Sequence, residues 1–179
     1  MSFESAFRKT VGCEGIYSND REDSGNWTGG AIGVGDLKGT KFGISAASYP
    51  DVDIRNLTIQ DAERIYVKDY WSKMSLDSIL SETLQEELFD TGVNMGVRTA
   101  VTICQRALNF LGVGFYKVDG VMGPITLSGV NYWASWDAEA LFRALNGFQF
   151  MEYVYVVENK GHKFAAGWMK RIQDYRGKP

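Results

Sequence analysis

The chain has 179 residues, enough for one domain with a substantial hydrophobic core. Hydrophobic residues make up 45% of it and charged residues 23%, close to the averages for soluble globular proteins. A formal net charge of −3, with no Lys/Arg run longer than two residues, argues against a nucleic-acid partner. No stretch approaches the roughly 20 apolar residues that cross a bilayer, so we expect no membrane insertion.

The first nine residues contain no apolar run behind a basic region, so they do not resemble a signal peptide. We therefore expect synthesis in the (host) cytoplasm and action on the cell wall after release. Cys13 and Cys104 lie far apart and do not suggest a disulfide framework. With His162 as the single histidine and no closely spaced cysteine pair, we expect no zinc site and no cofactor.

The front of the chain combines one helix with a polar insert. Apolar residues recur at helical spacing over residues 2–13, which predicts a first helix. Residues 18–43 are rich in Gly, Asp, Asn, Ser and Thr, a composition typical of turns and short hairpins. Short strands are expected at residues 31–34 and 40–44.

Helical patterns dominate from residue 58 onward. They predict helices over residues 58–70, 82–91, 99–111, 124–133 and 137–154. Thr58 and Asp137 are suitable N-caps, Gly112 is a suitable stop, and Pro124 favours a helix start. The expected fold is mainly α, a helical body with a Gly-rich loop or short β-hairpin insert near the N-terminus.

A group of carboxylates surrounds the junction between the first helix and the insert. Glycosidases need a protonated carboxyl that donates to the leaving oxygen and a second group that activates water or attacks. Glu14, at a helix end, can serve as the acid if its surroundings raise its pKa. Asp20 and Asp23 are candidates for the second group, and Thr40 for a hydroxyl that holds the attacking water. By themselves these residues are better explained as solvated turn carboxylates, because Glu and Asp are common on any surface.

Four segments, in order along the chain, resemble glycoside hydrolase family 108. They are the C-E-G-I-Y-S-N-D run at 13–20 followed by Asp23; G-T-K-F-G-I-S at 39–45; F-D-T-G-V-N-M-G at 89–96; and Q-R-A-L at 105–108 with V-D-G-x-x-G-P-x-T at 118–126. The ending F-x-x-G-W-x-x-R at 164–171 also resembles that family. The likeness covers nearly the whole chain.

The resemblance implies an N-acetylmuramidase of lysozyme-like α+β fold. It implies one domain over residues 1–179, with residues 1–96 as the catalytic part and 97–179 as a helical part similar to peptidoglycan-binding regions. Glu14 matches the family's catalytic glutamate. The expected role is a phage endolysin acting as a monomer on peptidoglycan glycan strands, and a bacterial enzyme exported by an unusual route is the open alternative. Ile16 replaces the usual second Gly and the insert is longer than usual, so the second carboxylate stays open between Asp20, which fits the spacing better, and Asp23.

Aromatic residues flank the polar insert. Tyr17, Trp27 and Tyr49 are candidates for stacking on sugar rings, and they fit a role in closing the local packing equally well. Asn94 could bind an N-acetyl group or cap a helix end, and the resemblance favours the first. Other aromatics are expected in the core, namely Tyr66, Tyr70, Trp71, Phe142, Phe148 and Phe150.

Three other functions remain open. A lytic transglycosylase would cleave the same bond with one Glu and no water. A cysteine amidase or endopeptidase would use Cys13 or Cys104 with His162, although neither cysteine is expected at a helix N-terminus. A non-catalytic module would bind the wall without dissolving it.

Overall fold

The computed structural model describes residues 3–12, 16–112, 114–161 and 165–172. The chain divides into two units, one formed by residues 1–6 and 70–179 and the other by residues 7–69. We call them the helical unit and the front unit and describe each by itself. None of the helices in the described part of the chain has the length and apolar character needed to cross a bilayer.

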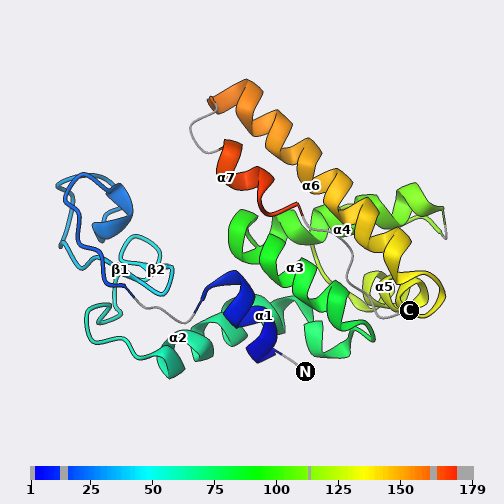
Figure 1. Cartoon of the computed structure of the whole chain (residues 1–179), viewed down its shortest axis with the longest axis horizontal. Helices are drawn as coiled ribbons and strands as arrows, with labels where there is room; N and C mark the ends of the chain where they lie inside the picture. The colour runs from blue at the N-terminus through cyan, green and yellow to red at the C-terminus, as the bar shows by residue number, and fades with distance from the viewer. Residues whose placement is uncertain (1–2, 13–15, 113, 162–164, 173–179) are drawn as a thin grey trace. The chain divides into compact units, whose positions relative to one another are not determined.

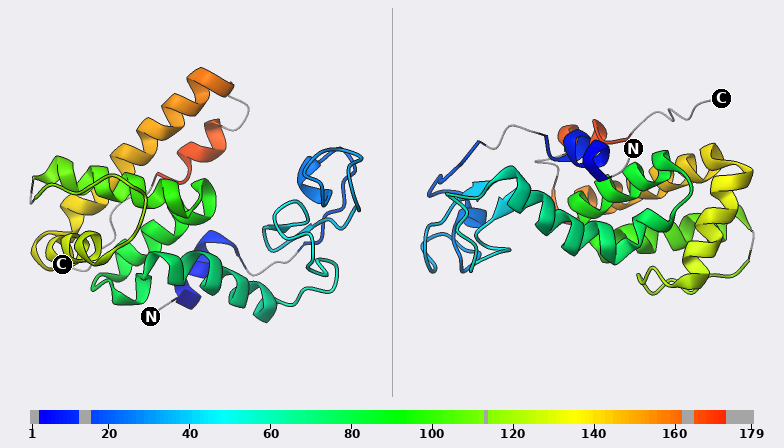
Figure 2. Two further views of the ribbon diagram at one scale, coloured as in Figure 1. Left: turned by 180° about the vertical axis from the view of Figure 1, so that it is seen from behind. Right: turned by 90° about the horizontal axis from the view of Figure 1, so that it is seen from below.

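The helical unit is built around three helices that lie side by side, α3 (Glu82–Met95), α4 (Val97–Leu111) and α6 (Ala138–Lys160) (Figure 1). Helix α5 (Pro124–Trp136) and the short α7 (Ala165–Met169) both contact α6, as the views from behind and below also show (Figure 2). Two short helical turns, η3 (Ser72–Met74) and η4 (Leu76–Ser78), precede α3. The core between these elements is apolar, with Leu84, Leu88, Phe89, Ile103, Leu108 and Leu141 almost fully buried.

The helix ends follow their capping residues. Ser81 Oγ accepts a hydrogen bond from the Leu84 amide (3.4 Å), and Asp137 Oδ1 accepts one from the Ala140 amide (3.0 Å), which confirms Asp137 as an N-cap. Gly112 has a φ of 79°, the left-handed conformation in which a glycine stops a helix. Pro124 stands in the first turn of α5, where its missing amide hydrogen is not needed.

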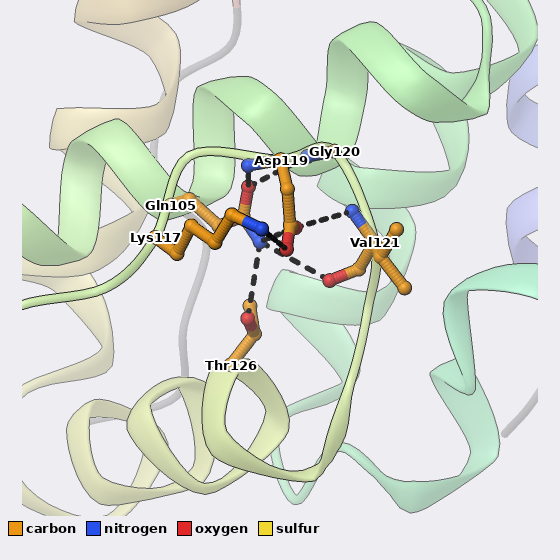
Figure 3. A network of polar contacts seen from close by, with 6 residues as sticks. All are labelled: Gln105, Lys117, Asp119, Gly120, Val121 and Thr126. Atoms are coloured by element: carbon orange, nitrogen blue, oxygen red, sulfur yellow. Dashed lines mark hydrogen bonds and ion pairs between the residues drawn. The ribbon is translucent and has the colours of Figure 1, made fainter.

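A single buried amide fastens the loop between α4 and α5. Gln105 Oε1 accepts hydrogen bonds from the amides of Asp119 (3.0 Å) and Gly120 (2.9 Å). Its Nε2 donates to Asp119 Oδ1, the Val121 carbonyl and Thr126 Oγ1 (Figure 3). Gln105 is 1% exposed, so one side chain from α4 fixes both the loop and the first turn of α5.

The front unit holds the polar insert and α2 (Ile59–Tyr66). Its regular elements are a 3₁₀ turn, η1 (Ser24–Asn26), and a two-stranded antiparallel sheet of β1 (Thr40–Lys41) and β2 (Ile44–Ser45). Thr58 and Asp61 form a reciprocal capping box at the start of α2, which confirms the predicted cap. A π-helical turn, η2 (Val67–Trp71), continues α2 to the boundary with the helical unit.

The first helix, α1 (Phe3–Thr10), contributes residues to both units. Phe3 makes edge-to-face contacts with Trp71 (5.5 Å between ring centroids) and Phe89 (5.7 Å) in the helical unit. Phe7 does the same with Tyr66 (5.4 Å) in the front unit. The apolar spacing that predicted this helix therefore serves two separate cores.

The mainly α fold is confirmed, and four details of the prediction are corrected. Residues 31–34 form a turn, closed by the Gly29 amide bonding the Val34 carbonyl (3.0 Å), and no strand. Residues 40–45 are a tight hairpin, because Phe42 and Gly43 both have positive φ and turn the chain. Phe150 is 44% exposed and Phe148 half-buried, since the long α6 turns part of its apolar surface outward.

Candidate functional site: a hydroxyl row in the front unit

Three hydroxyl side chains line up across the small sheet of the front unit. Ser18 forms an antiparallel bridge with Thr40, with reciprocal backbone hydrogen bonds of 2.9 and 2.8 Å. Thr40 is in turn directly opposite Ser45 in the pairing of β1 with β2. Residues that face each other across antiparallel strands project to the same side. We call Ser18, Thr40 and Ser45 the hydroxyl row.

The hydroxyl row faces away from the front unit's core. Ser18 is exposed, and Thr40 and Ser45 are half-buried. The next residue along β2, Ile44, is 1% exposed, as alternation along a strand requires for the opposite face. The hydroxyls therefore lie on the solvent-facing side of a hydrogen-bonded sheet whose other side is buried.

Two glycines make this tight arrangement possible. Gly39 has a φ of 83°, and a β-carbon there would lie 2.4 Å from the Ser18 carbonyl oxygen. Gly43 has a φ of 73°, and a β-carbon there would lie 2.6 Å from the Tyr66 hydroxyl. A side chain at position 39 would push Ser18 away from Thr40, and one at position 43 would displace the Tyr66 hydroxyl from the hairpin, which explains the glycines on both sides of Thr40.

Asp23 lies beside the hydroxyl row. It caps η1, with Oδ1 accepting from the Gly25 amide (2.9 Å). A β-carbon on Gly25 would lie 3.2 Å from Asp23 Oδ1 and 3.8 Å from Ser45 Cβ, so the carboxylate and Ser45 flank the same small residue. The structure therefore brings Asp23 and the Thr40–Ser45 pair into one neighbourhood.

Asp20 is held differently. Its Oδ1 accepts from the Glu22 amide (3.0 Å), and its backbone carbonyl accepts from Asn26 Nδ2 (2.9 Å). It lies in the turn just beyond Ser18, and its side chain is exposed. Both candidate carboxylates thus have one oxygen fixed by a backbone amide, and Asp23 also shares Gly25 as a neighbour with Ser45 of the hydroxyl row.

Asn26, which sequence reasoning missed, organises the insert. It is 0% exposed, and its backbone carbonyl accepts from the amides of Lys38 and Gly39 (both 3.0 Å). Its side chain reaches back to the Asp20 carbonyl. One buried residue therefore joins the turn that carries the carboxylates to the segment that enters β1. A buried Asn inside a polar loop gives no periodic signal in a sequence.

Three residues singled out by sequence reasoning, Cys13, Glu14 and His162, lie outside the described residues. Along the chain, Glu14 precedes Ser18, the first member of the hydroxyl row, by four positions.

The aromatic candidates use their polar ends internally. Tyr17 donates to the Lys38 carbonyl (3.2 Å), Trp27 Nε1 to the Arg21 carbonyl (3.0 Å), and Tyr49 to Asp69 Oδ2 (3.1 Å). All three are half-buried, so part of each ring stays accessible. In the helical unit, Asn94 Nδ2 donates to the Tyr153 hydroxyl (2.6 Å). Sugar contact by these four residues stays a prediction.

Two buried ionisable groups in the helical unit bear on the chemistry. Burial raises the pKa of the Cys104 thiol to about 12, and the side chain is 0% exposed, so Cys104 is unsuited to be a nucleophile. Burial, and then the neighbouring Asp90 charge, raise the pKa of Glu87 to about 8. Glu87 is 2% exposed between α3 and α6, so its proton is held in the core.

Comparison with models of protein families identifies the family of this chain. A model of the family described as glycosyl hydrolase 108 matches residues 7–96. The chain belongs to the glycosyl hydrolase 108 family. A second model, described as "Predicted Peptidoglycan domain", matches residues 99–173. The chain is a glycoside hydrolase of the lysozyme type, and its substrate is peptidoglycan.

The fold is similar to that in the structure of Brucella abortus SagA. The TM-score is 0.68 at 23% sequence identity, over 95% of this chain and 88% of that chain. A search of curated proteins finds no match. In this member of the glycosyl hydrolase 108 family, the hydroxyl row, Asp20 and Asp23 all fall inside the hydrolase match.

Two of the motifs that carried the family resemblance contact each other in the helical unit. Arg171 Nη1 donates to Asp90 Oδ1 (2.7 Å). Tyr153, whose hydroxyl accepts the hydrogen bond from Asn94 Nδ2, stacks its ring on Trp168 with centroids 5.3 Å apart. Asp90 and Asn94 lie in the hydrolase match, whereas the other three lie in the peptidoglycan-domain match. The two matched regions are therefore joined by direct side-chain contacts.

Proposed function

We propose that the chain is an N-acetylmuramidase that hydrolyses the bond between N-acetylmuramic acid and N-acetylglucosamine. The observation that carries this proposal is the position of Asp23, the cap of η1, beside the Thr40–Ser45 pair of the small sheet. A carboxylate next to a hydroxyl row offers a place for a water molecule, because both groups accept or donate hydrogen bonds to it.

Each residue has a distinct role in this proposal. Glu14 in its protonated form donates to the glycosidic oxygen as the bond to the anomeric carbon breaks. Asp23 accepts a proton from the water that attacks that carbon, and Thr40 orients the water. The preference for Asp23 over Asp20 rests on Gly25, which leaves room between the carboxylate and Ser45.

The first test is a digestion of purified peptidoglycan, with the fragments identified by mass spectrometry. The wild type is expected to release fragments with reducing-end N-acetylmuramic acid. Glu14→Gln keeps the shape of the acid but cannot donate the proton, so we expect a loss of about 100-fold or more in rate. Unchanged activity in this variant would remove Glu14 from the mechanism.

The choice between the two aspartates gives a matched pair of variants. Asp23→Asn should lower the rate by about 100-fold, because the amide cannot take the proton from water. Asp20→Asn should lower it by less than about ten-fold, because only a turn contact is altered. Rates are measured by release of reducing ends, with urea unfolding as a check on stability. The reverse order would assign the role to Asp20.

The other functions have their own products in the same experiment. Anhydro-muramic ends would indicate a lytic transglycosylase, and free stem peptides would indicate an amidase or endopeptidase. Binding without any soluble product would indicate a non-catalytic module. The burial of Cys104 leaves Cys13 as the cysteine that the amidase alternative would need.

For the biological role we propose a phage endolysin that acts as a monomer on the wall after release from the host cytoplasm. The support is the resemblance of the chain's motifs to those of endolysins. Expression in a bacterial host, with and without a co-expressed pore-forming protein, tests the role. Lysis only when the inner membrane is opened is expected, and lysis without the pore would contradict this release route.

A further inference from the structure

Helix α5 carries an exposed apolar stripe that the proposed chemistry does not use. Ile125 is 75% exposed, Tyr132 45% and Trp136 75%. Tyr132 lies about two helical turns after Ile125, and Trp136 about one turn after Tyr132, so the three lie on one line along the helix. The opposite side, with Thr126 and Val130, is buried. We call Ile125, Tyr132 and Trp136 the α5 stripe.

The helix that carries the stripe is held firmly in place. Asn131 Nδ2 donates to the Ser78 carbonyl (2.7 Å), and its Oδ1 accepts from the Leu80 amide (2.9 Å). Thr126 is bound to Gln105 at 3.2 Å (Figure 3). A β-carbon on Gly129 would lie 2.4 Å from the Tyr116 hydroxyl, so Tyr116 is packed tightly against the helix. A surface fixed in this way loses little conformational entropy when a ligand binds.

The charge of α5 limits what can occupy the stripe. From Pro124 to Trp136 the helix has no charged residue, although 23% of the whole chain is charged. A helix that lies on a membrane usually carries Lys or Arg on its polar face, which this helix lacks. A neutral ligand with an apolar face matches an uncharged aromatic surface, and the C–H face of an N-acetylated sugar ring is of this kind.

We propose that the α5 stripe is a second glycan-binding site, which holds a peptidoglycan strand through stacking of its sugar rings on Trp136 and Tyr132. The two rings are one turn apart, about the length of one sugar unit, and the small, exposed Ser128 lies one turn before Tyr132. The stripe lies inside the region that matches the "Predicted Peptidoglycan domain". The inference rests on peptidoglycan as the substrate and not on the assignment of Glu14, Asp23 or Thr40.

The test compares full-length variants for sedimentation with intact, insoluble peptidoglycan in the cold. Tyr132→Ala with Trp136→Ala should bind about ten-fold more weakly than the wild type. Tyr155→Ala removes another exposed aromatic, 61% exposed on α6, and should bind like the wild type. Titration with a soluble N-acetylglucosamine tetramer, followed by tryptophan fluorescence, should show the same order.

Several outcomes would overturn the inference. One is equal binding by the double variant and the wild type; another is an equal loss in the Tyr155→Ala control. A wild-type dimer that becomes a monomer in the double variant, seen by analytical ultracentrifugation, would mean that a second copy covers the stripe. If the double variant does not fold, Trp136→Ser alone is measured, because that side chain is mostly exposed.

The same experiments separate this inference from the proposed function. Rates on short soluble fragments should be unchanged in the double variant, since the stripe is not part of the hydroxyl row. If the wild type hydrolyses nothing but the double variant binds the wall more weakly, the proposed hydrolysis is contradicted and the second glycan-binding site is supported. If the wild type hydrolyses peptidoglycan and the double variant binds the wall as tightly as the wild type, the proposed hydrolysis is supported and the second glycan-binding site is contradicted.

Discussion

The buried carboxyl of Glu87 is expected to make the stability of the fold depend on pH. Its Oε1 accepts from the Thr91 hydroxyl at 3.5 Å, and its Oε2 is buried with no hydrogen-bond partner among the described residues. Burial and the nearby Asp90 raise its pKa from 4.5 to about 8. At neutral pH the folded chain therefore holds a proton here that the unfolded chain releases.

This proton makes stability depend on pH. Because the folded pKa is the higher one, the stabilisation is complete below pH 4.5 and is lost as the pH rises through about 8. The loss is at most about 1.4 kcal/mol per pH unit within that window. Urea unfolding at pH 5, 7 and 9 measures it.

Two variants check the assignment to Glu87. Glu87→Gln should be more stable than the wild type at pH 9 and less dependent on pH, because the amide stays neutral. Glu158→Gln, on the exposed surface of α6, should keep the wild-type profile. An unchanged pH dependence in Glu87→Gln would show that the proton resides elsewhere.

At the scale of elements, the joint between α4 and α5 depends on Gln105. Its five hydrogen bonds to Asp119, Gly120, Val121 and Thr126 are drawn in Figure 3. Asp119 also accepts from the Val121 amide (3.0 Å), and together with the Gln105 bond this holds the pKa of its carboxyl below the usual range. The loop that contains the Asp-Gly and Gly-Pro pairs is thus folded around the buried amide of Gln105.

Removing this amide should destabilise the helical unit. Gln105→Leu leaves the backbone amides of Asp119 and Gly120 without their acceptor, and we expect a loss of about 2–4 kcal/mol in the free energy of unfolding. Gln85→Leu, which loses a single bond to the Ile79 carbonyl (2.7 Å), is the control and should cost about 1 kcal/mol. Similar losses in the two variants would mean that the loop is held by its apolar contacts instead.

The same scale shows what the sequence could predict. Helices α2, α4, α5 and α6 were predicted because caps and apolar periodicity are local signals, as Thr58 and Asp137 illustrate. The hydroxyl row could not be predicted, because it depends on the pairing of Ser18 with Thr40, twenty-two positions away. The role of Gln105 was also invisible, since a Gln on the apolar side of a helix has no marked partner in sequence.

At the scale of the whole molecule, the two matched regions are joined across α3, α6 and the segment after α7. The Asp90–Arg171 ion pair connects positions 81 residues apart, and Asp90 is 6% exposed. A buried carboxylate without a cation is costly. We therefore expect this ion pair to stabilise the hydrolase region through the end of the peptidoglycan-domain region.

Arg171→Ala should lower the free energy of unfolding by about 2–3 kcal/mol, because it leaves the buried Asp90 charge without its cation. Adding Asp90→Asn should restore part of the loss, since the isolated charge is then removed. Thermal and urea unfolding of both variants measure this. A double variant that is less stable than Arg171→Ala would indicate that Asp90 stabilises the fold through other partners.

Because Cys104 is completely buried, its reaction with a thiol reagent can measure local opening of the core. A thiol that is 0% exposed, with its pKa raised to about 12, cannot react with an alkylating reagent while the core is closed. In a Cys13→Ser background, the labelling rate of Cys104 then measures how often α4 becomes accessible. A rate equal to that of global unfolding would mean that the helical unit opens only as a whole, and a faster rate would identify α4 as part of a smaller unit that opens on its own.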